Sequence, residues 1–369
     1  MASFSGLRSS IVFVFLCVAM HVAYGTHENR PVLFIFGDST ADVGTNNFLN
    51  TRARANVPYY GIDYPNSVPT GRFSNGFNTV DYIAKLFGYV ESPPPYLALL
   101  NDGRYTFKRD VIGGVNFASG GSGILRDTGK KQWGEVISLE RQVLQFEAVR
   151  ASLSKILGEK EAATFVSQAL FIISIGGNDL LEFSRNDTAV RLGQKHYLSA
   201  LQSNYYTCIR SLYALGARKF GIISVAAIGC CPAVKTMNYG GECVASLNQF
   251  ASVFNSATAS VLQRLSYELK DFKYSLGNSL AMTSAVLERP LIFGIKETKK
   301  ACCGEGKLNG EGPCLKANNA ELCGNRNDFL FWDWFHPTDK ASWFAASTLY
   351  SGGSDFVTPI NFRQLALMY

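Results

Sequence analysis

Short, continuous apolar runs alternate along the chain with longer stretches in which apolar residues return every three or four positions. The short runs have the length of strands buried on both faces, and they occupy residues 32–36, 115–118, 170–175 and 220–225. The longer stretches have the period of amphipathic helices, and they occupy residues 140–157, 189–215 and 247–269. This alternation predicts an α/β fold, in which a parallel sheet is covered by helices on both sides.

Residues 1–25 are predicted to be a secretory signal peptide. Arg8 precedes an apolar run at residues 11–20, and the small residues near position 25 are typical of a cleavage site. The alternative is a buried N-terminal helix. Cleavage would leave a secreted chain that begins near Thr26. Residues 26–369 contain no repeat, low-complexity linker or break in composition, so we expect them to form a single domain.

Composition narrows the class of protein. The 369 residues are 47% hydrophobic, which is enough to bury a large core. The formal net charge is +6, but the positive charges are scattered, so we do not expect nucleic-acid binding. The chain has no window of about eighteen uncharged apolar residues, and stable membrane insertion is therefore not expected.

Eight cysteines remain once Cys17 is removed with the signal peptide. Seven of them lie in glycine-rich loops at residues 230–243 and 302–323, without the spacing of zinc ligands. In an oxidising compartment this pattern favours disulfides over a metal site, and several pairings are possible. Asn186, in the triplet Asn186-Asp187-Thr188, is the one acceptor sequence for N-glycosylation.

Candidate chemistry follows the predicted strands. In open α/β sheets, functional residues lie beyond the carboxyl ends of the strands. Three polar or glycine-rich segments occupy such places, at residues 37–40, 119–123 and 176–179, and a fourth lies near the C-terminus at residues 333–337. Taken singly, each of these segments could be a simple turn or a helix cap.

His336 is the strongest candidate for a general base, because His27 lies near the predicted mature N-terminus and His196 lies in a polar helical stretch. Asp333 precedes it by three residues and could hydrogen-bond its imidazole. A histidine of this kind could activate Ser39, which follows the first predicted strand, as a nucleophile.

An oxyanion would need hydrogen-bond donors close to Ser39. The Ser39 backbone N–H, a glycine N–H from residues 120–123 and the side chain of Asn178 are the candidates.

These segments, in this order, resemble the ordered blocks of the GDSL esterase/lipase family within the SGNH hydrolases: Phe36-Gly37-Asp38-Ser39, residues 114–119, Gly176-Gly177-Asn178-Asp179 and residues 333–337. Residues 70–76 and 301–304 are similar to those of its secreted plant branch. Thr40 stands where the family name has leucine, and we expect little effect on the chemistry. The resemblance extends over about residues 32–350.

The resemblance implies a flavodoxin-like three-layer αβα sandwich and hydrolysis of carboxylic esters through an acyl-enzyme, without a metal or organic cofactor. Ser39 would be the nucleophile, His336 the base and Asp333 the residue that orients it. Ser39, Gly121 and Asn178 would hold the oxyanion, with Gly123 as the alternative to Gly121. The location would be extracellular, in the cell wall or apoplast, with the vacuole as an alternative.

Two other functions use the same features. An acyltransferase would use the same three residues with an acceptor other than water, and a non-catalytic carbohydrate- or lipid-binding protein would keep the fold without the reaction. The substrate is also open among fatty-acyl lipids, acetylated wall polysaccharides and phenolic esters. Aromatic residues at positions 329–335 could line an acyl groove or belong to the core.

Overall fold

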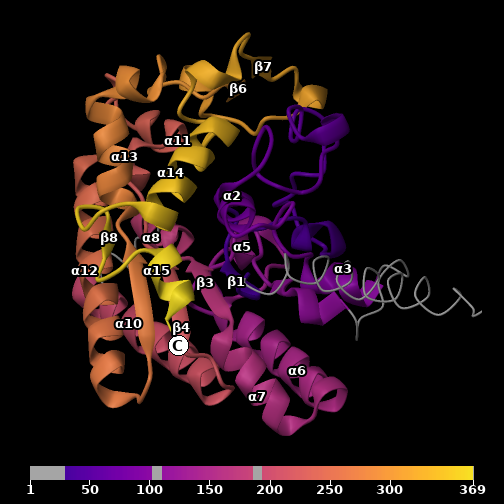
Figure 1. Cartoon of the computed structure of the whole chain (residues 1–369). Coiled ribbons are helices and arrows are strands. Elements are labelled where there is room, and N and C mark those ends of the chain that lie inside the picture. Colours follow the sequence, from indigo (N-terminus) through magenta and orange to yellow (C-terminus); the bar gives the residue numbers. More distant parts are fainter. Residues whose placement is uncertain (1–29, 102–109, 186–192, 369) are drawn as a thin grey trace, which may run out of the picture. The chain divides into compact units, whose positions relative to one another are not determined.

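Strands and helices alternate through the described part of the chain, which comprises residues 30–101, 110–185 and 193–368 of the computed structural model (Figure 1). Val32–Tyr369 form one unit. Its main sheet has the strand order β2-β1-β3-β4-β5-β8, in which β8 alone is antiparallel to its neighbour. The strands of this sheet are β1 (Leu33–Gly37), β2 (Val115–Asn116), β3 (Leu170–Ser174), β4 (Lys219–Ile223), β5 (Lys273–Gly277) and β8 (Val357–Thr358).

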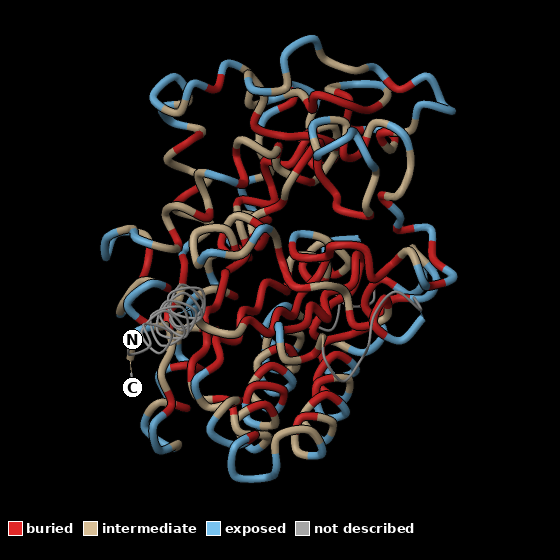
Figure 2. Tube along the Cα trace, turned by 45° about the vertical axis from the view of Figure 1, so that its right-hand side comes forward, coloured by how far each residue is buried: buried red, intermediate tan, exposed pale blue. Residues whose placement is uncertain are grey.

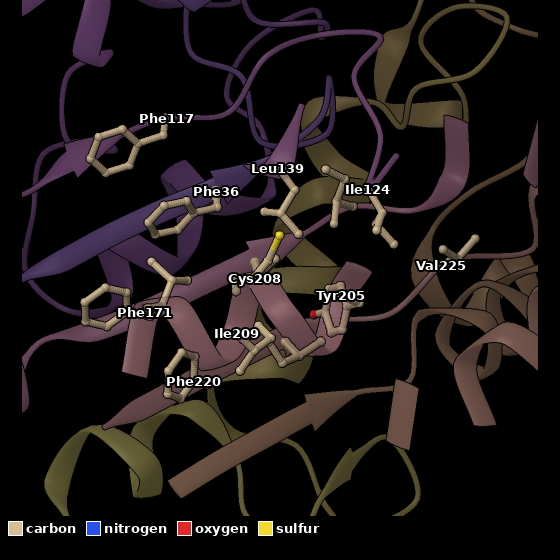
Figure 3. Packing of buried hydrophobic residues seen from close by; sticks show 14 of the residues in the cluster. Phe36, Phe117, Ile124, Leu139, Phe171, Tyr205, Cys208, Ile209, Phe220 and Val225 are labelled. Carbon is tan, nitrogen blue, oxygen red and sulfur yellow. The ribbon is translucent and has the colours of Figure 1, made fainter. Parts of the chain in front are cut away.

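The side chains of the central strands alternate between two apolar layers. In β1, Phe36 belongs to one layer and Ile35 to the other, and both side chains are fully buried. Figure 3 shows Phe36, Phe171 and Phe220, from three neighbouring strands, in a row within the first layer. Burial on both faces explains why these strands are continuous apolar runs.

Helices cover both faces of the sheet. The first apolar layer is closed by α6 (Leu139–Leu157), α7 (Glu159–Gln168), α10 (Gln194–Ala214) and α12 (Ala245–Glu268). The second layer is closed by α2 (Thr79–Leu86), α14 (Asp339–Ser351) and α15 (Phe362–Leu367). Figure 2 shows buried residues on the inner sides of the helices and exposed residues on their outer sides.

Shorter elements connect these layers. The remaining helices are α3 (Tyr96–Asn101), α5 (Lys130–Trp133), α8 (Gly177–Ser184), α11 (Pro232–Lys235) and α13 (Ser279–Glu288). A two-stranded sheet pairs β6 (Cys303–Gly304) with β7 (Glu321–Leu322). None of the described helices is both long and apolar enough to cross a membrane.

This architecture confirms the predicted α/β fold, a mainly parallel sheet between two helical layers. The strand predicted at residues 115–118 is observed as the shorter β2, although the N–H groups of Phe117 and Ser119 still donate to carbonyls of β1 at 2.7 and 3.0 Å. Strand β5 was not predicted, since it mixes polar and apolar residues and is only partly buried. The predicted helix at residues 189–215 is observed as α10, and its first residues lie outside the described part of the chain.

The structure pairs six of the seven cysteines in the glycine-rich loops, as the preference for disulfides predicted. The bonds are Cys230–Cys243, Cys302–Cys323 and Cys303–Cys314. Cys231, the seventh loop cysteine, and Cys208 on α10 are buried free thiols. Burial raises the pKa of both thiols to about 12, which keeps them protonated and unreactive at neutral pH. The predicted signal peptide at residues 1–25 and Asn186 lie outside the described residues.

Candidate active site

Ser39 lies in the sharp turn that follows β1. Gly37 ends this strand with a φ of 155°, and a Cβ atom at this position would lie 2.3 Å from the carbonyl oxygen of Ser174 on β3. Only glycine fits so close to the neighbouring strand. The N–H of Ala41 then donates to the carbonyl of Asp38, which bends the chain away from the sheet and leaves Ser39 partly exposed.

Gln142 of α6 holds the end of β1 in place. Its side-chain amide nitrogen donates to the carbonyl of Gly37 at 2.8 Å, and its oxygen accepts the Gly37 N–H, also at 2.8 Å. Gln142 is fully buried, and the Gly37 carbonyl also accepts the N–H of Ser119 at 3.0 Å. The backbone N–H and C=O of Gly37 are therefore both paired.

His336 lies in the loop before α14, as Pro337 predicted. The backbone N–H of Trp332 donates to the His336 carbonyl at 2.8 Å, and the side chain of Thr338 caps α14. The ring of Phe73 packs against the imidazole, with 4.9 Å between the ring centroids. These contacts hold the histidine in one orientation.

The structure brings Ser39, His336 and Asp333 together, although Ser39 and His336 are 297 residues apart in the sequence. Nε2 of His336 lies 2.7 Å from Ser39 Oγ, and Nδ1 lies 2.8 Å from Asp333 Oδ1. Because the carboxylate accepts the Nδ1 proton, Nε2 is left as the acceptor for the serine hydroxyl. The arrangement can move a proton from Ser39 to His336.

Asp333 is fully buried, yet its carboxylate has several donors. Burial alone would raise the pKa of Asp333, but the neighbouring His336 and the hydrogen bonds to the carboxylate leave that pKa below its ordinary value. The backbone N–H groups of Phe335 and His336 donate to Oδ1 at 2.9 and 2.8 Å. The hydroxyl of Tyr60 donates to Oδ2 at 2.8 Å.

The predicted oxyanion donors line the same cleft as Ser39. Among the described residues, the backbone N–H groups of Ser39 and Gly121 have no hydrogen-bond acceptor. The side-chain nitrogen of Asn178, in the first turn of α8, donates one proton to the carbonyl of Ser122 at 2.9 Å and has a second proton free to donate. Gly123 does not line this cleft, so the geometry favours Gly121 over Gly123.

Two buried carboxylates hold the glycine loop. Asp42 accepts the N–H of Gly120 at 2.8 Å, and Asp179 accepts the N–H groups of Ile124 and Leu125 at 2.9 and 3.1 Å. Asp179 also accepts the hydroxyl proton of Thr128 at 2.7 Å. Gly121 therefore lies between two fixed points of the backbone.

The cleft around Ser39 has a volume of about 350 Å³, within the usual range for small-molecule sites. Trp133, Trp334 and Phe335 supply apolar surface, and Arg52 and Arg185 also line the cleft. The cleft therefore offers both apolar and cationic surface to a ligand.

The disulfide-linked loops support the segment that carries Asp333 and His336. The N–H groups of Cys302 and Cys303 donate to the carbonyls of Phe331 and Trp332 at 3.0 and 2.8 Å. Both cysteines form disulfides, so these cross-links also restrain the neighbouring backbone segment that contains His336.

Several residues that support the site were not predicted from the sequence. Tyr60, Gln142 and Asp42 were not singled out, and Asp179 was quoted without a role. The partners named above are 51 to 273 residues away in sequence, so no local pattern indicates these contacts. A polar residue inside the apolar stripe of a helix, as at Gln142, was the one available signal. His196 is exposed on α10, as expected.

Comparison with known proteins identifies the class. The family model described as GDSL-like Lipase/Acylhydrolase matches residues 33–349. The chain therefore belongs to this family, and it is a carboxylic ester hydrolase.

The chain is similar to several proteins of Arabidopsis thaliana. GDSL esterase/lipase LTL1 is 37% identical over 370 residues, which cover 98% of this chain and 96% of that protein. GDSL esterase/lipase At4g28780 is 36% identical, with 95% of each chain covered. GDSL esterase/lipase At5g18430 is 35% identical, with 89% of this chain and 90% of that protein covered.

Proposed function

We propose that the protein is a secreted serine esterase/lipase that hydrolyses carboxylic esters through Ser39, His336 and Asp333. The observation that carries this proposal is the 2.7 Å contact between His336 Nε2 and Ser39 Oγ, with Asp333 bound to the other ring nitrogen. A serine hydroxyl is a weak nucleophile until a neighbouring base accepts its proton. A buried carboxylate on the far side of the ring stabilises the imidazolium that results.

In the first step, Ser39 Oγ bonds to the ester carbonyl carbon while its proton passes to His336 Nε2. The carbonyl electron pair moves to oxygen, where the N–H groups of Ser39 and Gly121 and the free amide proton of Asn178 donate to it. The bond to the alcohol then breaks, and His336 gives its proton to the departing alcohol. The acyl group remains on Ser39.

In the second step, water attacks the acyl carbon and gives a proton to His336. The tetrahedral intermediate collapses to release the carboxylic acid, and the proton returns to Ser39 Oγ. All proton transfers use the one imidazole, so neither a metal nor an organic cofactor is required in this scheme.

Fluorophosphonate labelling tests this function. The folded protein should be labelled once, at Ser39, and should hydrolyse a short ester such as p-nitrophenyl acetate. The Ser39→Ala protein should do neither while keeping the same thermal midpoint. A folded, unlabelled and inactive wild-type protein would favour the non-catalytic binding function instead. Adding an alcohol to the assay separates hydrolysis from acyl transfer, since a transferase would form the new ester in preference to the free acid.

The proposal includes secretion as a single mature domain that begins near Thr26, with a glycan on Asn186. It is supported by the apolar run at residues 11–20 and by the three disulfides, which form in oxidising compartments. N-terminal sequencing and glycosidase treatment of the native protein test it. An intact Met1 would contradict secretion by this route.

A further inference from the structure

A second, mainly apolar cavity adjoins the cleft around Ser39. Its volume is about 240 Å³, and its lining residues come from the ends of β3 and β4 and from the helices α13 and α14. Six residues line both spaces: Asp38, Thr40, Gly177, Ile228, Cys231 and Phe335. Thr40 follows Ser39 and Gly177 precedes Asn178, so the shared wall lies directly beside the site of bond cleavage.

Several hydroxyl groups in the wall of this cavity are already hydrogen-bonded within the protein. Thr283 donates to the Ser279 carbonyl at 2.8 Å, and Thr348 donates to the Phe344 carbonyl at 2.9 Å. The Ser224 hydroxyl accepts the Ser279 N–H at 3.0 Å. These groups gain little by binding a polar ligand.

Charge is nearly absent from the wall. Of the residues that line the cavity, Asp38 is the one with a carboxyl group, and none is a lysine, an arginine or a histidine. Asp38 already accepts the backbone N–H and the hydroxyl proton of Thr40, at 2.9 and 2.8 Å. The rest of the wall is largely aliphatic and aromatic, with side chains such as Ile175, Ile223, Met282, Val286, Phe293 and Phe331.

We propose that this cavity holds the acyl chain of the substrate, and that the preferred substrates are esters of medium-chain fatty acids rather than acetyl esters. This inference rests on the proposed function, since it places the ester carbonyl at Ser39. When the ester carbonyl oxygen points toward Gly121 and Asn178, the acyl chain passes Gly177. Gly177 has no side chain to block this route, and a Cβ atom placed there would have Ile228 Cγ2 as its nearest neighbour, at 3.9 Å.

The volume sets an expected chain length. A methylene group is close in size to a water molecule, whose share of liquid volume is about 30 Å³, so the cavity has room for about eight methylenes. Burial of each methylene should raise kcat/KM about fourfold. We therefore expect kcat/KM to increase from acetate to about the decanoate and then to level off.

A chain-length series with two cavity-filling variants tests the assignment. Ala285 on α13 and Ala345 on α14 are both half-buried and both line the cavity. Ala285→Phe and Ala345→Phe should each lower kcat/KM for p-nitrophenyl decanoate at least about tenfold more than for p-nitrophenyl acetate. Ala200→Phe is the matched control, because Ala200 is half-buried on α10 and does not line the cavity.

The results separate failure of this inference from failure of the proposed function. If acetate is hydrolysed but kcat/KM does not depend on chain length, or if both variants affect all esters equally, the acyl assignment is wrong. If no ester is hydrolysed, binding of decanoate to the Ser39→Ala protein, measured by calorimetry, still tests the cavity. That binding should be lost in Ser39→Ala/Ala285→Phe and kept in Ser39→Ala/Ala200→Phe, and equal binding in both would overturn the assignment.

Tyr60 carries a second, independent inference. Its hydroxyl donates to Asp333 Oδ2, while Oδ1 faces His336. Its ring is held by Phe73 and Trp332, with 6.2 Å between centroids in each case. Burial and the Asp333 charge raise the pKa of Tyr60 well above its ordinary value, so the phenol remains a donor.

We infer that Tyr60 is a positioning residue that acts on His336 through Asp333. It fixes the rotation of the carboxylate and draws part of its negative charge toward Oδ2. The other titratable groups that act on this pair are Asp38, which interacts with His336, and Cys231, which interacts with Asp333. Neither donates a hydrogen bond to Asp333 among the described residues.

The pH profile of Tyr60→Phe tests this role. Without the phenol, more charge faces the imidazole and favours its protonated form, so the acid limb of kcat/KM should move to higher pH and kcat/KM should fall about tenfold. Tyr205→Phe, which removes a buried hydroxyl in α10, should leave the profile unchanged. A lower thermal midpoint with an unchanged acid limb would show that Tyr60 is structural only.

Discussion

Asp333 and Asp179 are both fully buried carboxylates beside the candidate active site, but their surroundings differ. Burial would raise the pKa of each. At Asp333 the neighbouring His336 and the hydrogen bonds outweigh burial and lower the pKa, whereas at Asp179 burial prevails and raises it to about 6. The partners of Asp179 are two backbone N–H groups and a threonine hydroxyl, all of them neutral.

The difference separates two tasks within one site. A carboxylate next to an imidazole is stabilised in its charged form and can in turn stabilise an imidazolium. A carboxylate that is bound only by neutral donors organises the backbone, because it gathers several N–H groups at one point. In the proposed mechanism Asp333 therefore supplies charge to the reaction, whereas Asp179 holds the loop that carries Gly121.

Asp333→Asn should give the largest effect on turnover. The side chain keeps its size, but its amide cannot hold the imidazole in the required tautomer, and kcat should fall about 10⁴-fold. Measurement of kcat together with the thermal midpoint checks this. A loss of less than about tenfold in a folded sample would show that the Asp333 charge is not used.

Asn178→Ala should lower kcat by about 10²–10³, with little change in KM. The reason is that its free amide proton meets a full negative charge only in the tetrahedral intermediate. The measurement is kcat per site titrated by fluorophosphonate. Normal turnover per titrated site, with a reduced thermal midpoint, would limit Asn178 to supporting the turn after β3.

Asp179→Asn should act mainly on stability. In the variant an NH₂ donor replaces one of the two acceptor oxygens of Asp179, so at least one buried donor in the loop loses its acceptor. The free energy of unfolding should therefore fall by about 1–3 kcal/mol. We expect kcat to fall only about tenfold, through displacement of Gly121. Denaturant unfolding and kcat of the same sample check this. Asp127→Asn, an exposed acid in the same loop, is the control.

The pH dependence of stability should show the smallest effect. Because the pKa of Asp179 is about 6 in the folded state and near 3.8 when unfolded, the folded protein binds the extra proton between these values. The contribution of Asp179 to the free energy of unfolding therefore decreases as pH rises from about 4 to 6. Between pH 4.5 and pH 6.5, urea unfolding should show a stronger decrease, or a weaker increase, in the free energy of unfolding for wild type than for Asp179→Asn. Identical slopes would contradict the raised pKa.

The sequence alone was enough to predict the fold class and the loops that carry the proposed chemistry. The fold class and three of these four loops follow from local features. A strand buried on both faces must be a continuous apolar run, and polar residues that follow such runs mark the carboxyl edge of a parallel sheet. Strand β5 was missed because half-buried Lys273 and Tyr274 interrupt that pattern.

The tertiary structure decided which side chains meet. Three findings depend on distances between segments far apart in the chain. Gly121 rather than Gly123 lines the cleft, Tyr60 contacts Asp333, and Cys208 and Cys231 remain unpaired. The same holds for the apolar cavity, whose walls come from β3, β4, α13 and α14. Such distances are set by the packing of whole helices and strands against one another. Because many residues far apart in the sequence contribute to this packing, no local sequence pattern encodes the distances.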